Sequence, residues 1–144
     1  MVMLMRKVLI LDDREDYLRA LTSALRAEFE IVTARSLGEA MERMDTSIEV
    51  ALVDVRLSEE DEQNRDGVRF LEWVKKNYPN VPVVMMSAYR DFDAAVEALN
   101  LGADYFLKKP IDLRELKQLL RSFAEHGSLA AEKERLHRRE EGER

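Results

Sequence analysis

Four short, unbroken apolar runs constrain the fold of this 144-residue chain more than any other feature. They occupy residues 8–11, 50–53, 81–86 and 105–107. An apolar run without polar alternation is typical of a strand that is covered on both faces, as in a parallel sheet. Ile31 and Val32 form a shorter run with polar neighbours, which predicts a further strand at the edge of the sheet.

Helical periodicity fills the gaps between these runs. Apolar residues recur at helical spacing in the segments 18–25, 37–44, 68–74, 94–101 and 113–123. Ser36 with Glu39, and Asp112 with Glu115, have the spacing of capping boxes and predict two helix starts. Gly102 predicts a helix end. Strict alternation of five strands with five helices predicts a doubly wound α/β sheet with right-handed crossovers.

Composition narrows the class of protein. Hydrophobic residues make up 46% of the chain and charged residues 36%, which fits one domain over residues 1–126. Residues 127–144 are highly charged and lack a broad apolar stripe, so we expect a helical or disordered tail. A frayed end is our preferred interpretation of it, and a linker helix to an output domain is the alternative.

Location and gross charge can also be judged from the sequence. No apolar run is long enough to span a membrane, and no secretory signal pattern is visible. There are no cysteines, which fits a reducing compartment, and we expect a cytoplasmic protein. The net charge of −6 gives no reason to expect direct nucleic-acid binding.

Polar residues stand where four of the predicted strands end. These are Asp12 and Asp13, Asp54, Ser87, and Lys108 with Lys109 before Pro110. Sites in doubly wound sheets form outside the carboxyl ends of the strands, so we expect these groups to converge. Three neighbouring carboxylates repel one another unless a cation binds. Oxygen ligands without cysteine or a nearby histidine favour Mg²⁺, with Mn²⁺ as the second choice, over Zn²⁺.

A carboxylate in such a place can act as a nucleophile and form an aspartyl phosphate. Phosphoryl transfer needs mainly positioning and positive charge around the transferred group, which Mg²⁺ and a lysine can supply. A hydroxyl such as that of Ser87 can donate to a phosphoryl oxygen. Each residue alone would more often be a turn former or a solvated side chain, and their joint placement favours the chemical interpretation.

The segments VLILDD, ALVDVRL, VVMMSAY and LGADYFLKKPID carry a family resemblance. Together, across residues 6–126, they resemble the CheY-like receiver domain of two-component response regulators. The resemblance implies a flavodoxin-like three-layer fold with strand order 2-1-3-4-5. It also implies a regulatory domain that promotes its own phosphotransfer and dephosphorylation, rather than an enzyme acting on a separate substrate.

Residue roles follow from this resemblance. Asp54 would accept a phosphoryl group from a sensor histidine kinase, a phosphotransfer protein or acetyl phosphate. Asp13, Asp54 and the backbone carbonyl of Arg56 would bind Mg²⁺ directly, and Asp12 would bind it through water. Lys109 would hold the phosphoryl group, with the Lys109–Pro110 peptide bond cis and Lys108 on the other face.

A switch is implied as well. Ser87 would turn toward the phosphoryl group, and Phe106 would change rotamer to fill the space left behind. The readout surface would be the fourth helix, the fifth strand and the fifth helix, which could also form a homodimer.

Three features depart from the usual family pattern. The loop at residues 57–65 is acidic and longer than the usual connection by about five residues. It is either a tolerated surface insertion, which we prefer, or a segment that limits access or selects the kinase. Arg56 and Tyr89 are bulky at positions that influence aspartyl phosphate hydrolysis in the family, so we expect a long phosphorylated lifetime. Phe106 lacks the hydroxyl of a tyrosine.

Three other functions fit the sequence less well. A haloacid-dehalogenase-like phosphohydrolase would need a second aspartate where Arg56 stands. A flavodoxin-like nucleotide binder would need a phosphate loop rich in glycine, serine or threonine after the first strand, where residues 12–16 are mostly acidic. An unphosphorylated interaction module would not need the complete set of acidic residues with Ser87 and Lys109.

Overall fold

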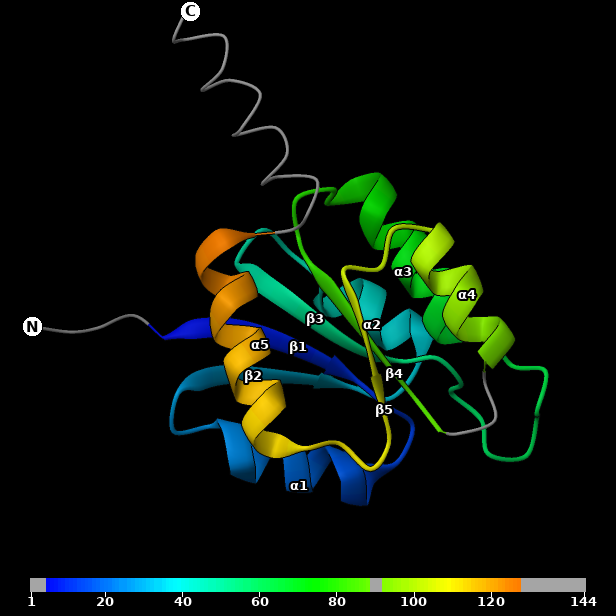
Figure 1. Cartoon of the computed structure of the whole chain (residues 1–144), viewed down its shortest axis with the longest axis horizontal. Helices are drawn as coiled ribbons and strands as arrows, with labels where there is room; N and C mark the ends of the chain where they lie inside the picture. The colour runs from blue at the N-terminus through cyan, green and yellow to red at the C-terminus, as the bar shows by residue number, and fades with distance from the viewer. Residues whose placement is uncertain (1–4, 89–91, 128–144) are drawn as a thin grey trace, which may run out of the picture.

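The computed structural model describes residues 5–88 and 92–127. It consists of a five-stranded parallel sheet with helices on both faces (Figure 1). The strands are β1 (Arg6–Leu11), β2 (Phe29–Ala34), β3 (Ile48–Asp54), β4 (Val83–Ser87) and β5 (Tyr105–Lys108). The helices are α1 (Glu15–Leu25), α2 (Leu37–Arg43), α3 (Asp66–Asn77), α4 (Phe92–Asn100) and α5 (Leu113–His126). The strand order is β2-β1-β3-β4-β5, and all neighbouring pairs are parallel. The predicted flavodoxin-like fold is confirmed.

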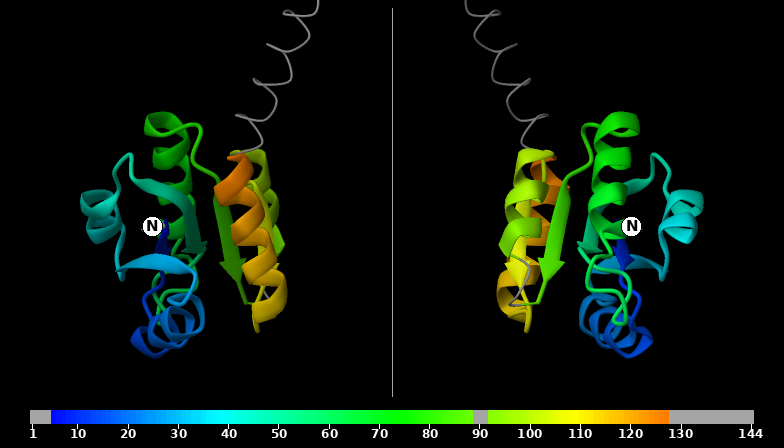
Figure 2. Two further views of the ribbon diagram at one scale, coloured as in Figure 1. Left: turned by 90° about the vertical axis from the view of Figure 1, so that its left-hand side faces the viewer. Right: turned by 90° about the vertical axis from the view of Figure 1, so that its right-hand side faces the viewer.

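Both faces of the sheet are covered, which explains the unbroken apolar runs. Helices α1 and α5 pack on one face, and α2, α3 and α4 pack on the other; Figure 2 shows α3 and α5 on opposite sides of the sheet. Within β1, Val8 and Ile10 belong to the core cluster beneath α1 and α5, whereas Leu9 and Leu11 belong to the cluster beneath α2, α3 and α4. Side chains alternate along a strand, so a strand buried on both faces must be apolar at every position.

The predicted element ends also agree with the structure. The Ser36 hydroxyl caps α2 by accepting a hydrogen bond from the Glu39 backbone N–H at 3.2 Å. The Asp112 carboxylate accepts bonds from two backbone N–H groups in the first turn of α5. Gly102 follows α4 with a φ of +99°, a conformation that glycine adopts at little cost. The half-buried β2 lies at the edge of the sheet, as expected.

Gly67 lets the start of α3 lie directly against the end of β3. A Cβ atom at this position would lie 1.8 Å from the Asp54 carbonyl oxygen, far inside van der Waals contact. The Gly67 backbone N–H donates to the Val55 carbonyl oxygen at 3.0 Å. This close approach fixes the backbone around Asp54, and any side chain here would push the two elements apart.

Towards the C-terminus, the structure describes the chain as far as Gly127. Helix α5 ends at His126, and Gly127 follows it with a φ of +77°. The predicted tail beyond that glycine, residues 128–144, lies outside the described residues. Within the described residues, no helix combines the length and the apolar character needed to cross a membrane.

Candidate functional site

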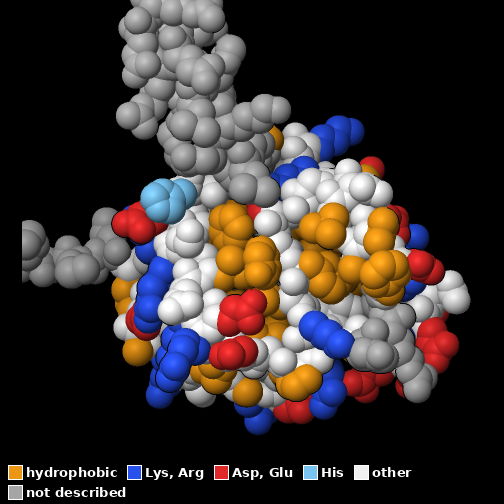
Figure 3. Space-filling model, in the orientation of Figure 1, with side chains coloured by type: hydrophobic (Ala, Val, Ile, Leu, Met, Phe, Trp, Pro, Cys, Tyr) orange, Lys and Arg blue, Asp and Glu red, His pale blue; other side chains and the backbone are white. Residues whose placement is uncertain are grey.

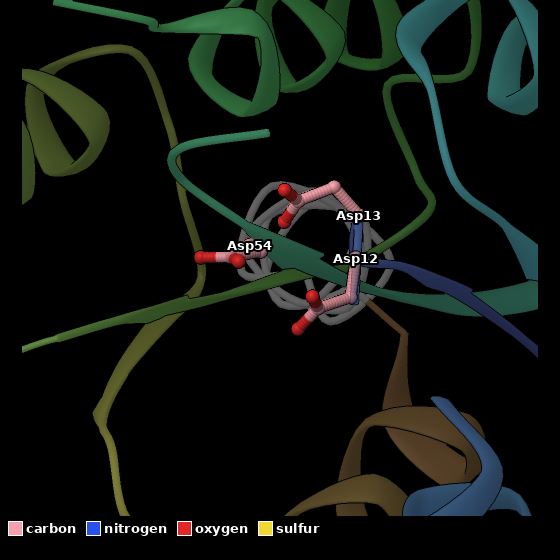
Figure 4. A group of neighbouring side chains, drawn as sticks. All are labelled: Asp12, Asp13 and Asp54. Atoms are coloured by element: carbon pink, nitrogen blue, oxygen red, sulfur yellow. The ribbon is translucent and has the colours of Figure 1, made fainter. Parts of the chain in front are cut away.

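Three carboxylates meet where β1 and β3 end. These strands are neighbours, with Leu11 beside Val53 in the register, so the residues that follow them are brought side by side. Carboxylate oxygens of Asp12, Asp13 and Asp54 all lie within 4.8 Å of one another (Figure 4). The sheet topology therefore brings together residues that are far apart in the sequence.

Asp54 is a buried carboxylate with a strongly perturbed affinity for protons. Its residue is 7% exposed. Burial raises the pKa of Asp54 to about 7; the ammonium of Lys109 opposes this rise, and the negative charge of Asp12 adds to it. Burial also raises the pKa of Asp13, with repulsion from Asp12 as the next cause and a further contribution from Glu59. Burial thus makes the ionised forms of both carboxylates costly.

Lys109 supplies the positive charge of the site. Its Nζ donates to Asp12 Oδ2 at 2.9 Å and to Asp54 Oδ2 at 3.2 Å. Burial on its own would lower the pKa of Lys109, but the charges of Asp54 and Asp12 outweigh it and the pKa is raised. The peptide bond between Lys109 and Pro110 is cis, as predicted. Lys108 is exposed, whereas Lys109 turns inward.

Asp12 is fully buried, and both of its carboxylate oxygens accept hydrogen bonds. The Arg14 backbone N–H donates to Oδ1 at 2.9 Å, and Lys109 donates to Oδ2. Asp12 is therefore held in one orientation. Of the three clustered aspartates, Asp13 and Asp54 line the neighbouring cleft.

The predicted switch residues occupy the expected strands. Ser87 is the last residue of β4 and is 1% exposed, and its hydroxyl donates to the Ala88 carbonyl oxygen at 3.2 Å. Phe106 is half-buried in β5 and packs against the core cluster beneath α3 and α4. Tyr89 lies outside the described residues. The roles of all three remain predictions.

A cleft of about 120 Å³ lies beside Asp13, Asp54 and Lys109. Seven residues line it: Asp13, Arg14, Asp54, Arg56, Glu59, Ala88 and Lys109. The clustered oxygens and the raised pKa of Asp13 fit a small hard cation, which would take a few carboxylate oxygens and keep several waters. The same cleft has room beside Asp54 for a phosphoryl group.

Sequence reasoning missed Tyr17 and Arg14, and it expected Glu59 near the site only as part of the acidic loop. The ring of Tyr17 lies against Lys109, with its centroid 4.3 Å from Nζ, an arrangement that stabilises a cation. Arg14 and Glu59 line the cleft although they come from different segments. Tyr17 follows the aspartate pair by about one helical turn, and this spacing was the only signal that could have drawn attention to it.

Comparisons with known proteins agree with this geometry. The family profile described as the response regulator receiver domain matches residues 8–121. The response regulator PilR of Pseudomonas aeruginosa is 33% identical over 117 residues, which is 80% of this chain and 25% of that protein. The regulatory protein AtoC of Escherichia coli is 32% identical over 133 residues, covering 91% of this chain and 28% of AtoC. The chain spans about a quarter of the length of these relatives.

Solved structures give the same result. A CheY-like receiver domain protein from Methanospirillum hungatei superposes with a TM-score of 0.76 at 26% identity, covering 91% of this chain and 99% of that one. The receiver domain of NtrX from Brucella abortus gives a TM-score of 0.72 at 29% identity, covering 82% and 98%. These matches favour the phosphoacceptor interpretation over the phosphohydrolase alternative.

The buried charge of Asp54 predicts a pH-dependent effect of Asp54→Asn. Without divalent cations, Asp54 binds a proton more tightly in the folded state, with a pKa of about 7, than at its ordinary value of 3.8. The stability that this group contributes is complete below pH 3.8 and is lost as the pH rises through 7. Asparagine does not titrate, so the stability advantage of the variant should grow by about 2 kcal/mol between pH 5 and pH 8.

Urea denaturation of both proteins in EDTA measures this difference. Saturating Mg²⁺ should shrink it, because a bound cation stabilises the ionised carboxylate. A stability difference that stays constant from pH 5 to pH 8 would contradict the assignment of a raised pKa to Asp54.

Proposed function

This chain belongs to the response regulator receiver domain family, and we propose that Asp54 is its phosphoacceptor in a two-component phosphorelay. One observation carries the proposal: a buried carboxylate at a strand end clusters with two further aspartates, and it shares a cleft with one of them, Asp13, and with a lysine that contacts it. Positioned charge of this kind is the main requirement of phosphoryl transfer.

Asp54 acts as the nucleophile in this proposal. One of its carboxylate oxygens forms a bond to phosphorus while the bond from phosphorus to the donor atom breaks. That donor atom is a histidine nitrogen of a kinase or phosphotransfer protein, or the acyl phosphate oxygen of acetyl phosphate. Lys109, already 3.2 Å from Asp54 Oδ2, pairs with the transferred oxygens.

The residues present fit Mg²⁺ as the cofactor, with Mn²⁺ as a substitute. Asp13, Asp54 and the backbone carbonyl of Arg56 would hold the ion directly, and Asp12 would hold it through water. The ion would supply positive charge against the donor phosphate and the carboxylates. Asp12 itself keeps Lys109 in place through the 2.9 Å contact.

Phosphorylation would redistribute the contacts around Lys109 and Ser87. The Ser87 hydroxyl, which now donates to the Ala88 carbonyl oxygen, would turn to a phosphoryl oxygen, and Phe106 would move into the space left behind. A local change in charge would then shift a two-state element. The surface of α4, β5 and α5 would report the change.

The face of α4, β5 and α5 carries exposed apolar side chains, which supports a role in binding (Figure 3). Val96 and Leu99 on α4 are 44% and 53% exposed, and Tyr105 on β5 is 41% exposed. Exposed apolar groups gathered on one face are typical of an interaction surface. We propose that the chain is cytoplasmic and takes its phosphoryl group from a sensor histidine kinase. Its α4, β5 and α5 surface would then bind an output domain or a second copy of the chain.

Phosphorylation of Asp54 is the central test. Incubation with acetyl phosphate and Mg²⁺ should raise the intact mass by one phosphoryl group, and the adduct should disappear when EDTA replaces Mg²⁺. Asp54→Asn should form no adduct, whereas Asp93→Asn, which changes an exposed carboxylate on α4, should form it normally. An adduct that persists in Asp54→Asn would overturn the proposal, and turnover of a phosphate ester by the purified chain would revive the phosphohydrolase alternative.

Arg56 and Tyr89 should slow the loss of the phosphoryl group. Arg56 lines the cleft beside Asp54, where a bulky side chain hinders an attacking water. We expect replacement of both residues by alanine to shorten the half-life of the adduct by about an order of magnitude, roughly 1.4 kcal/mol in the hydrolysis barrier. The half-life is followed by intact mass after removal of the donor, and equal half-lives would disprove this role.

Phosphorylation should also promote self-association through α4, β5 and α5. Sedimentation analysis of the phosphorylated chain should show dimers, and Leu99→Asp should suppress them because a charge would be buried in the interface. Met5→Asp is the matched control, since Met5 is 45% exposed and directly precedes β1, which β3 and β4 separate from β5 in the sheet. Equal dimerisation of the Leu99 variant and the unaltered chain would remove the proposed interface.

A further inference from the structure

The acidic loop at residues 57–65 is an organised structure beside the cleft. The side-chain oxygen of Asn64 accepts hydrogen bonds from the backbone N–H of Leu57 at 2.9 Å and of Asp66 at 3.0 Å. One amide thus ties together the two ends of the loop. Leu57 packs against the core cluster beneath α3 and α4, which anchors the base of the loop.

Further contacts give the middle of the loop a defined course. The Ser58 hydroxyl accepts from the Asp61 backbone N–H at 3.2 Å, and the Asp61 carboxylate accepts from the Gln63 backbone N–H at 2.9 Å. These short-range bonds shape the segment into a turn.

Glu59 is the loop residue that reaches the cleft. It lines the cleft together with Asp13 and Asp54. Its Oε1 lies 3.2 Å from Nε of Arg14, which also lines the cleft and directly precedes α1. Two side chains of opposite charge therefore meet beside the cleft that Asp54 lines.

This ion pair is too exposed to work as a mechanical latch. The side chains of Arg14 and Glu59 are 51% and 64% exposed, and exposed pairs contribute little stability. Arg14 also pairs with Asp16 at 3.1 Å, so it is shared between two carboxylates. The consequence of the arrangement is electrostatic, because it sets the charge that an approaching anion meets at the mouth of the cleft.

We propose that Glu59 and Arg14 make the cleft discriminate by charge among phosphodonors. Glu59 repels free, highly charged anionic donors, and Arg14 partly offsets that repulsion. A protein donor is less affected, because its phosphohistidine is delivered by contacts over a wider surface. This inference rests on the proposed phosphorylation of Asp54, and it assigns a selective role to the acidic loop.

The two residues should act in opposite directions on the rate of phosphorylation by acetyl phosphate. At low ionic strength and saturating Mg²⁺, we expect Glu59→Gln to raise the rate roughly two- to fivefold and Arg14→Gln to lower it by a similar factor. Salt should reduce both effects. Phosphoramidate, a less highly charged donor, should show smaller changes.

Matched variants separate charge from structure. Glu42→Gln makes the same charge change on an exposed residue near the carboxyl end of α2, shortly before β3 begins. Glu42 does not line the cleft, so this variant should leave the rate unchanged. Arg14→Lys keeps the positive charge and should remain close to the unaltered chain. Melting temperatures of all variants show whether a rate change reflects a loss of folded protein.

The outcomes distinguish this inference from the proposed function. If neither the unaltered chain nor any variant forms an Asp54 adduct, the proposed function is wrong. If the adduct forms but Glu59→Gln reacts at the normal rate, the inference alone is wrong. Acceleration in both Glu59→Gln and Arg14→Gln would also overturn it, because a mechanical latch and not charge would then control entry.

Discussion

The contact of one ammonium group with two buried carboxylates is the interaction on which the rest of the site depends. Lys109 Nζ lies 2.9 Å from Asp12 Oδ2 and 3.2 Å from Asp54 Oδ2. Buried carboxylates are costly unless they are paired, and here one lysine partners two of them. Tyr17 supports the same ammonium from another side with its ring face. The site therefore combines charge that is held in place with charge that is only partly compensated.

That incomplete compensation connects the structure to its proposed chemistry. Burial raises the pKa of Asp54 to about 7, so its ionised form is costly, and a bound hard cation would relieve that cost. The same groups then suit a phosphoryl group, which brings new negative charge and needs positive partners. Gly67 contributes indirectly, because its missing side chain allows α3 to pack against the backbone of Asp54.

Much of the fold and part of the site could be predicted from local sequence patterns. The unbroken apolar runs predicted strands buried on both faces, and Ser36 and Asp112 predicted helix starts because capping depends on a few adjacent residues. The convergence of Asp12, Asp54 and Lys109 followed from the rule that the ends of parallel strands share an edge of the sheet. Tyr17, Arg14 and the contact of Arg14 with Glu59 were not foreseen, since these contacts join segments that no local pattern relates.

The sequence by itself determined which residues can carry the chemistry: three aspartates, a lysine and a serine, each placed at the end of a strand or within two residues after it. It determined this because strand ends and helix starts are set by short-range periodicity and capping. Only the tertiary structure decided how the charges are shared, with Lys109 bound to Asp12 and Asp54 and with Glu59 opposite Arg14 at the mouth of the cleft. The physical reason is that electrostatic energies depend on distance and burial, and both quantities arise only when distant segments pack together.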